Sequence, residues 1–268
     1  MVAQRINHKW GMVVDLDRCT GCQACVVACQ AENNIPINVK SFYQQRRAYQ
    51  WIRIERYWEG EFPNVKAKFI PILCQHCENA PCEPVCPVFA TYHNDEGANV
   101  QIYNRCIGTR YCSVNCPYTV RMFNFWEPSW PKSLRNQLNP DVTIRTRGIM
   151  EKCSFCVQRL RRGEVNVERR GLEPLTGERI PAGERTMNYR QMKEGNYLPA
   201  CVQSCPTNAL QFADQHDDSG PVKEYFEEAN EQIETRHQGG HVDEGHTRVY
   251  RLFEEIGTKP NVVYLKKV

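Results

Sequence analysis

Thiol side chains dominate the residues of this sequence that could do chemistry. Fifteen cysteines lie in four tight groups, separated by long stretches without cysteine. Such clustering is typical of metal ligands, because thiolate is a soft ligand that binds iron–sulfur clusters and zinc. The groups are Cys19, Cys22, Cys25 and Cys29; Cys74, Cys77, Cys82 and Cys86; Cys106, Cys112 and Cys116; and Cys153, Cys156, Cys201 and Cys205.

The spacing within these groups favours iron–sulfur chemistry over zinc. Cys19 to Cys29 follow C-x2-C-x2-C-x3-C, the run of bacterial two-cluster ferredoxins, in which three thiolates bind one cubane and the fourth serves its neighbour. Proline directly follows Cys86, Cys116 and Cys205, and this ending belongs to the same run. Paired C-x2-C loops also build zinc sites, so a zinc-stabilised interaction module is the alternative. The odd cysteine count disfavours a disulfide framework.

Fifteen thiols are one fewer than four complete ligand sets need. The segment from Cys106 to Cys112 restores the ferredoxin spacing if Thr109 stands where a cysteine would. A neutral hydroxyl is a poor iron ligand beside thiolate, so we expect a [3Fe–4S] cluster there and three [4Fe–4S] clusters elsewhere. A four-iron cluster with oxygen at one corner and catalysis at an open iron are the alternatives. No paired acid and base accompanies the site, so we expect no catalytic residue and no enzyme activity of this chain on its own.

Short apolar runs near the cysteines predict strands that position the loops. Met12–Val14, Phe69–Leu73, Val100–Tyr103 and Ala209–Phe212 each lie close to one group. The repeating unit is therefore a strand, a cysteine loop and a short helix, and the first group pairs with the fourth as the second pairs with the third. We predict an α+β fold of two ferredoxin-like modules, each of the 2×[4Fe–4S] type, with hairpin and loop insertions.

The remaining segments complete the expected domain organisation. Turn residues between alternating runs predict hairpins over Trp51–Leu73 and Ala90–Tyr103. The polar stretches Arg159–Arg185 and Asp214–Thr247 are poor core material, and we expect them at the surface or against a partner. A short helix at Tyr250–Ile256 and a strand at Val262–Leu265 are expected in the tail. The predicted units are residues 1–40 with 145–215 for clusters one and two, 65–125 for clusters three and four, a hairpin insertion at 41–64, and a C-terminal wrapping segment at 216–268.

Composition excludes several classes of function. No run of eighteen apolar residues occurs, so no membrane-spanning helix is predicted. The formal net charge of +3 is small for 268 residues, so nucleic acid is not an expected partner. The segment Met1–Gly11 has neither an apolar stretch nor a twin-arginine pair, so we expect no export signal on this chain.

Longer stretches around the cysteines resemble a known family. All four groups match the four-cluster subunits of complex iron–sulfur molybdoenzymes, such as dimethyl sulfoxide, polysulfide and nitrate reductases. Two branches are most similar: the iron–sulfur subunit of the quinone reductase complex (Qrc) of sulfate reducers, and the ferredoxin-like domain of alternative complex III. The segments that carry the resemblance are CTGCQACVVACQAENNIP (19–36), CQHCENAPCEPVCPV (74–88), CIGTRYCSVNCPY (106–118) and RGIMEKCSFCVQR (147–159).

The resemblance implies a specific assignment of ligands to clusters. In the family's exchange pattern, each cysteine set combines residues from two sequence groups. The implied sets are Cys19, Cys22, Cys25 and Cys205 for the first cluster; Cys29, Cys153, Cys156 and Cys201 for the second; Cys74, Cys77, Cys82 and Cys116 for the third; and Cys86, Cys106 and Cys112 for the three-iron fourth. We call these the first to fourth sets.

Partners and location are also implied by the resemblance. The expected function is single-electron transfer in a membrane-bound respiratory oxidoreductase, with the fourth cluster nearest a quinone site. The expected partners are a molybdopterin-like large subunit, an NrfD-like quinone-binding integral membrane subunit and a multihaem cytochrome c. The family favours attachment at the periplasmic face after export with a signal-bearing partner, and the cytoplasmic face is the alternative.

Three further features have ordinary structural explanations beside functional ones. His76 could tune a cluster by hydrogen bonding, but a loop histidine that faces solvent or a neighbour is the expectation. Aromatic residues could assist electron tunnelling, but packing or interface anchoring is expected of them. The basic residues that follow Cys156 could bind nucleic acid, but a protein interface or a solvated face is favoured. The aromatic set is Trp51, Tyr57, Trp58, Trp126 and Trp130, and the basic set is Arg159, Arg161, Arg162, Arg169 and Arg170.

Overall fold

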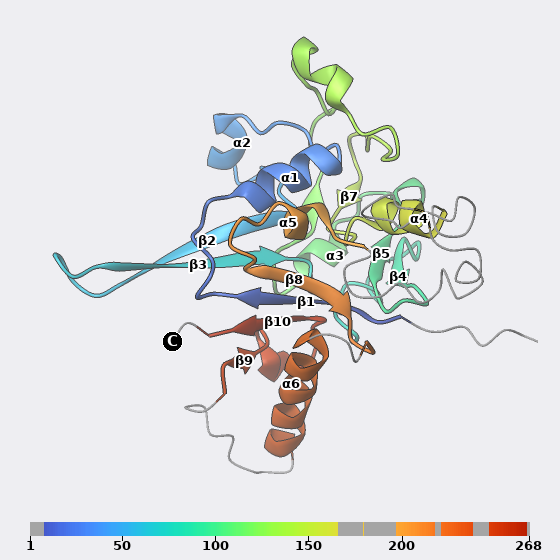
Figure 1. Ribbon diagram of the computed structural model, residues 1–268. Coiled ribbons are helices and arrows are strands. Elements are labelled where there is room, and N and C mark those ends of the chain that lie inside the picture. Colours follow the sequence, from blue (N-terminus) through green and yellow to red (C-terminus); the bar gives the residue numbers. More distant parts are fainter. Residues whose placement is uncertain (1–7, 166–178, 180–196, 218–220, 238–246, 267–268) are drawn as a thin grey trace, which may run out of the picture.

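A computed structural model describes residues 8–165, 179, 197–217, 221–237 and 247–266. Helices and strands alternate along these ranges, so the structure contains both kinds of element (Figure 1). The strands are β1 (Trp10–Asp15), β2 (Ile52–Glu59), β3 (Lys66–Leu73), β4 (Thr91–His93), β5 (Asn99–Gln101), β6 (Met122–Phe123), β7 (Met150–Glu151), β8 (Leu210–Asp214), β9 (Val249–Tyr250) and β10 (Val262–Leu265). The α-helices are α1 (Ala24–Glu32), α2 (Lys40–Gln44), α3 (Tyr111–Val114), α4 (Val157–Val165), α5 (Ala200–Gln203) and α6 (Pro221–His237), with 3₁₀ turns at Tyr103–Arg105, Lys132–Gln137 and Glu254–Ile256.

A four-stranded sheet in the order β8-β1-β10-β9 organises the fold. Strand β1 pairs antiparallel with β8 and parallel with β10, so segments far apart in the sequence lie side by side. Every residue of β1 is buried, because the sheet is covered on both faces. Figure 1 shows α1 and α5 on one side of this sheet and α6 on the other.

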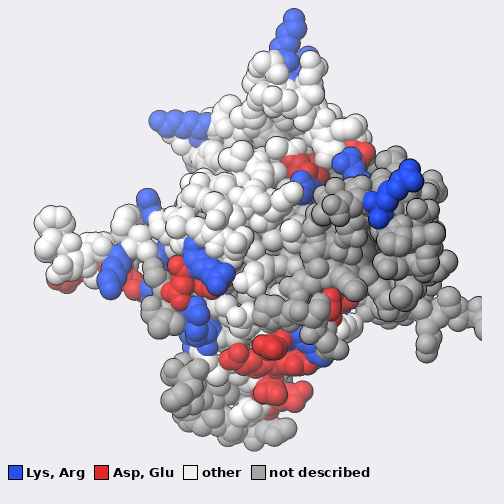
Figure 2. Space-filling view, in the orientation of Figure 1, with Lys and Arg blue, Asp and Glu red and all other residues white. Residues whose placement is uncertain are grey.

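Helix α6 and the tail strands form a small core of their own. Phe226 and Ala229 of α6 pack with Val13 of β1 and Val263 of β10. Gly11 is required at this contact, because a Cβ there would lie 2.7 Å from the ring of Phe226. Acidic side chains gather over α6 in the lower part of Figure 2, as expected for a helix with one buried face and one solvated face.

Three two-stranded sheets extend the fold around the cysteine loops. Strands β2 and β3 form a long antiparallel hairpin that projects from the body of the molecule (Figure 1). Strands β4 and β5 form a shorter hairpin, and β6 pairs with β7. The β6–β7 pairing joins the chain that follows the third cysteine group to the chain that precedes Cys153. It therefore links the two predicted modules.

A buried ion pair stabilises this junction. Glu151 of β7 accepts a hydrogen bond from Arg145 at 2.9 Å, and both side chains are almost fully shielded from solvent. Its carboxylate also accepts hydrogen bonds from the indole of Trp51 at 3.1 Å and from the amide of Asn124. One carboxylate thus holds together three segments: the start of the long hairpin, β6 with its following loop, and β7.

Most of the expected strands are present, and two expectations for the C-terminal part of the chain are wrong. The structure has both predicted hairpins and the strand at Val262–Leu265. The expected helix at Tyr250–Ile256 is only a 3₁₀ turn, because Phe253 takes the left-handed conformation, which an α-helix excludes. The stretch Asp214–Thr247 was expected to be poor core material, but it contains α6 and its buried face. Of the stretch Arg159–Arg185, the part beyond Val165 lies outside the described residues, apart from Arg179.

Candidate functional site

The first set of thiols lines a cavity next to the base of the long hairpin. Cys19, Cys22, Cys25 and Cys205 lie around this cavity, with Ile54 and Pro71 beside them. The thiols lie close enough for one to raise the pKa of another, as Cys205 does for Cys25. Gly21 takes a left-handed conformation in the loop, and a Cβ there would lie 2.4 Å from Phe69.

The thiols of the second set are the most deeply buried. Cys29 of α1 interacts with Cys153, Cys156 and Cys201, and all four residues are buried. The amide of Asn33 lies between two of these thiols, 3.6 Å from the Cys29 sulfur and 3.7 Å from the Cys156 sulfur. Asn33 is 1% exposed, so this donor is held inside the set.

The third set lines a second cavity. Cys74, Cys77, Cys82 and Cys116 surround it, and Cys77 interacts electrostatically with the other three thiols. Cys82 and Cys116 come from loops that are well separated in the sequence. The sulfurs nevertheless face the same space, because β4 and β5 fold the intervening chain back as a hairpin.

The fourth set contains three thiols and lies beside Thr109. Cys112 interacts with Cys106 and Cys86. Thr109 is exposed, and it lines an open groove at the surface. The preceding Gly108 has a φ of +75°, and a Cβ there would lie 2.1 Å from the carbonyl oxygen of Gly148. The loop that carries Thr109 therefore passes directly against the chain that leads to β7.

The four sets lie in a row. Cys201 of the second set interacts with Cys25 of the first, and Cys153 of the second interacts with Cys74 of the third. The guanidinium of Arg121 interacts with Cys74 of the third set and Cys112 of the fourth. All four thiols of the second set are buried, the third and fourth sets include the half-buried Cys116, Cys86 and Cys106, and Cys22 of the first set is exposed. The loop of the fourth set also carries the exposed Thr109. The row therefore begins and ends near the surface.

The electrostatics of the pockets fit a positively charged iron–sulfide core between the thiols. Burial raises the pKa of Cys25, Cys77 and Cys153 to about 12, and neighbouring thiols contribute to this rise. A thiolate is the form that binds metal, and in these pockets it needs positive charge beside it. Burial also acts to raise the pKa of Cys205, but hydrogen bonds from Leu210, Thr207 and Ala209 outweigh that effect and lower it.

Backbone N–H groups point at several sulfurs. The N–H of Ala90 lies 3.2 Å from the Cys86 sulfur, and that of Ala209 lies 3.2 Å from the Cys205 sulfur. In both places the donor is four residues after a cysteine that precedes a proline. Such N–H donors stabilise negative charge on sulfur, and hydrogen bonds to sulfur are one of the factors that set the potential of a cluster.

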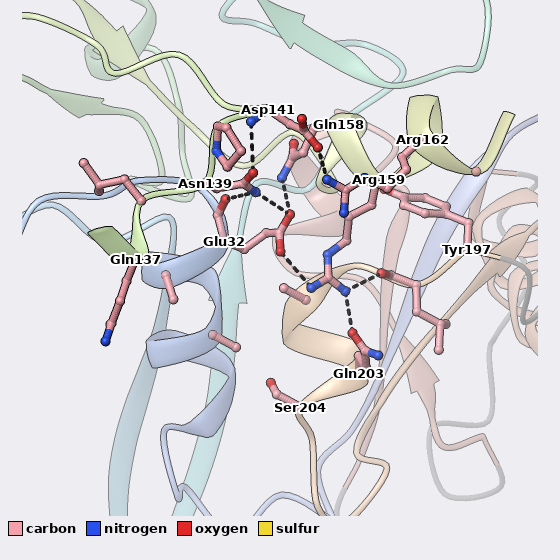
Figure 3. Close-up of a pocket in the computed structure, with 17 residues that line it drawn as sticks. Glu32, Gln137, Asn139, Asp141, Gln158, Arg159, Arg162, Tyr197, Gln203 and Ser204 are labelled. Atoms are coloured by element: carbon pink, nitrogen blue, oxygen red, sulfur yellow. Dashed lines mark hydrogen bonds and ion pairs between the residues drawn. The ribbon is translucent and has the colours of Figure 1, made fainter. Parts of the chain in front are cut away.

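A polar network holds the helices that carry the second set. Arg159 of α4 donates to Glu32 of α1 at 2.7 Å, and also to Gln203 of α5 and to the carbonyl of Leu198 (Figure 3). Asn139 bonds Glu32 from the other side. These residues line a large surface pocket, and they lock α1, α4 and α5 in one arrangement.

The other residues considered from the sequence have mixed outcomes. His76 does not face solvent: it is fully buried and stacks on Phe155 with the ring centroids 3.8 Å apart. Trp51 is buried and Trp126 stacks on Phe42, as packing requires, while Trp58 of the long hairpin is 62% exposed. Arg159 and Arg162 make ion pairs with acidic side chains. Arg169 and Arg170 lie outside the described residues.

Sequence reasoning missed Asn33, Arg121 and Lys152, which contribute polar groups to the second and third sets. Lys152 immediately precedes Cys153, a signal that spacing alone did not use.

In the described part of the chain, no three cysteine, histidine or acidic side chains gather tightly enough to hold a single metal ion. None of the described helices combines the length and apolar character that crossing a membrane requires.

Comparison with known proteins first defines the class. Two family models match, both described as a 4Fe–4S dicluster domain, over residues 18–90 and 65–132. The fold and the thiol sets thus define an iron–sulfur protein of the ferredoxin-like class. The matched ranges include the first three cysteine groups.

Relatives then identify the family. The chain is 36% identical to the iron–sulfur cluster-binding subunit of menaquinone reductase from Nitratidesulfovibrio vulgaris, over 97% of this chain and 89% of that protein. It is 32% identical to iron–sulfur subunit 1 of the Hdr-like menaquinol oxidoreductase of Archaeoglobus fulgidus, over 98% and 85%. A putative iron–sulfur subunit of dimethyl sulfoxide reductase from Halobacterium salinarum is 31% identical, over 96% and 79%. The chain belongs to the family of iron–sulfur subunits of complex iron–sulfur molybdoenzymes.

Proposed function

We propose that this chain is the non-catalytic electron-transfer subunit of a membrane-bound, quinone-linked respiratory oxidoreductase. It passes single electrons through three [4Fe–4S] clusters and one [3Fe–4S] cluster. The first, second and third sets hold the four-iron clusters, and the fourth set holds the three-iron cluster. The first and second sets belong to one ferredoxin-like module, and the third and fourth sets belong to the other.

The observation that carries this proposal is the row of four thiol sets, with the exposed Cys22 at the first end, the exposed Thr109 in the loop of the fourth set, and a fully buried second set. Buried clusters can exchange electrons only with their neighbours, whereas clusters at exposed ends can reach a partner protein. A structural zinc module would need no such row. Cys25 and Cys201, and likewise Cys74 and Cys153, lie close enough to interact electrostatically, which supports electron transfer between adjacent sets.

The three-iron assignment depends on Thr109. Thr109 lies in the loop between Cys106 and Cys112, at the position in the sequence where the ferredoxin spacing has a cysteine, and the set has three cysteines. An oxygen ligand of neutral charge binds iron weakly beside thiolate. The fourth iron is therefore absent from this cluster.

The names of the relatives support the proposed partners. Menaquinone reductase and menaquinol oxidoreductase subunits are among them, so we assign the exposed end at the fourth set to an NrfD-like membrane subunit with a quinone site. The end at the first set meets a molybdopterin-like large subunit, and a multihaem cytochrome c completes the complex. The complex lies at the periplasmic face of the membrane, and attachment at the cytoplasmic face is the alternative.

Anaerobic purification of the intact complex tests the proposal. We expect non-haem iron and acid-labile sulfide in near-equal amounts, and the electron paramagnetic resonance (EPR) signal of an oxidised three-iron cluster. Replacement of Cys112 by serine should abolish that signal, whereas Ser113→Ala should leave it intact. Zinc in place of non-haem iron, without acid-labile sulfide, would refute the proposal and establish a zinc-stabilised module.

A further inference from the structure

A lysine is buried at the junction of the second and third sets. Lys152 is 1% exposed, although lysine is rarely buried without a charged partner. Its ammonium donates hydrogen bonds to the carbonyl oxygen of Cys153 at 2.6 Å and to the carbonyl oxygen of Asn99. Both acceptors are neutral, so the positive charge is solvated but not compensated.

An arginine is buried at the junction of the third and fourth sets. Arg121 is 4% exposed and lines the cavity of the third set. Its guanidinium donates to Thr91 and Asn99 at 2.6 Å and to Gln101 at 2.9 Å. These three acceptors are also neutral. Within the described ranges, neither Arg121 nor Lys152 has a carboxylate in ion-pair contact.

The pair of Arg145 and Glu151 provides a comparison, because here a buried cation has an acidic partner. There the guanidinium meets a carboxylate at 2.9 Å, and the pair is neutral overall. A buried charge without an opposite partner is strongly destabilising. Lys152 and Arg121 therefore require negative charge close by, and both hydrogen-bond to Asn99, which lines the cavity of the third set.

We propose that Lys152 and Arg121 are the counter-charges of the third cluster and raise its reduction potential above that of the first cluster. This inference rests on the proposed function, because it needs a cluster in the third set. Four thiolates around a cubane leave net negative charge, and reduction adds one more electron to it. Two buried cations beside that cluster favour the reduced form more than the oxidised form, since charges in a buried site are poorly screened.

The placement of the two cations makes the effect local. Both meet at Asn99 beside the third set and act on Cys82. Lys152 also lies near Cys153 of the second set, Arg121 also hydrogen-bonds to Cys112 of the fourth, and neither interacts with a thiol of the first set in the described structure. An electron is consequently held more strongly in the middle of the row than at its first end. The two residues act through charge and contribute no ligand.

Redox titration of the intact complex, followed by EPR, tests this inference. The signal of the third cluster is assigned by its loss in Cys74→Ser. We expect Lys152→Met to lower the ratio of reduced to oxidised third cluster about tenfold at a fixed potential, which is about 59 mV for a one-electron couple. The titration of the first cluster should stay unchanged. Arg121→Gln should shift the third cluster in the same direction, independently of Lys152.

Two controls separate charge from packing. Lys152→Arg keeps the charge and should retain the potential of the third cluster. Lys223→Met is the control for loss of a lysine elsewhere: Lys223 is on α6, which lies on the other side of the central sheet from α1 and α5. Equal downward shifts in Lys152→Met and Lys152→Arg would overturn the inference, since they would show that packing sets the potential. A full third-cluster signal at unchanged potential in both Lys152→Met and Arg121→Gln would also overturn it. If the unmodified complex showed no cluster signals, the proposed function itself would fail.

Discussion

The carboxylate of Glu151 provides a direct test of how the two modules are joined. In Glu151→Gln the charge is lost while size and shape are nearly kept. Arg145 would then be a buried cation without a partner, because its guanidinium has no other acidic contact among the described residues. Breaking a buried pair by removing one partner costs about 3–5 kcal/mol.

This loss of stability lowers the midpoint temperature of thermal unfolding by a measurable amount. For domains of 150–250 residues, each kcal/mol changes the midpoint of thermal unfolding by about 2–4 °C. Multiplying the two ranges gives a decrease of roughly 6–20 °C for Glu151→Gln. The assay is the temperature at which visible absorbance bleaches on heating under anaerobic conditions, at one fixed heating rate, because unfolding with cluster loss is irreversible.

A surface pair supplies the matched control. Arg162 and Asp141 also form an arginine–carboxylate pair, but both side chains are well exposed. Exposed pairs contribute about 0–1 kcal/mol, so Asp141→Asn should leave the bleaching temperature nearly unchanged. In the double variant Arg145→Met with Glu151→Leu, part of the loss should be recovered, since no buried charge is left unpaired. Equal bleaching temperatures for Glu151→Gln and Asp141→Asn would refute this account of the junction.

Three further predictions concern the clusters and the response to pH. Thr109→Cys should convert the three-iron cluster to a four-iron cluster, lower its potential and slow quinone turnover, and unchanged EPR spectra would contradict the role of Thr109. Asn33→Leu removes the amide beside Cys29 and Cys156, so the potential of the second cluster should fall while that of the fourth stays constant. The hydrogen bond that His93 donates to Glu83 raises the pKa of His93. The stability that this pair contributes is therefore present at low pH and is lost as the pH rises through the raised pKa. Bleaching temperatures measured at pH values on both sides of that transition should show this slope in the unmodified protein and a flatter one in His93→Gln.

The sequence was most informative where residue spacing decides local structure. Three cysteines at two-residue intervals require a tight loop, and alternation over Trp51–Leu73 requires a hairpin, so both follow from short-range rules. Helix α6 was missed although Val222, Phe226 and Ala229 follow helical spacing, because the charged residues between them masked the pattern. The parallel pairing of β1 with β10 joins residues from opposite ends of the chain, and no short-range rule predicts it.

The polar residues around the sulfurs were harder to find for a different reason. Lysine and arginine are usually exposed, and in the sequence only the neighbouring Cys153 points to burial of Lys152, while nothing points to burial of Arg121. Their positions depend on how the β4–β5 hairpin and the β6–β7 pairing bring separate loops together. For His76 the sequence left solvent and a neighbour open, and the structure shows the neighbour. Its burial follows from contact with Phe155, which lies much later in the sequence.

Helix α1 carries Cys25 of the first set and Cys29 of the second, one helical turn apart. Four residues of α-helix rise about 6 Å, so backbone geometry fixes the offset between these two ligands. Inserting a single residue between them would rotate Cys29 by about 100° and turn its sulfur away from the second set. One inserted residue in this helix would therefore remove a ligand from the second cluster and interrupt the path of electrons between the first and the third.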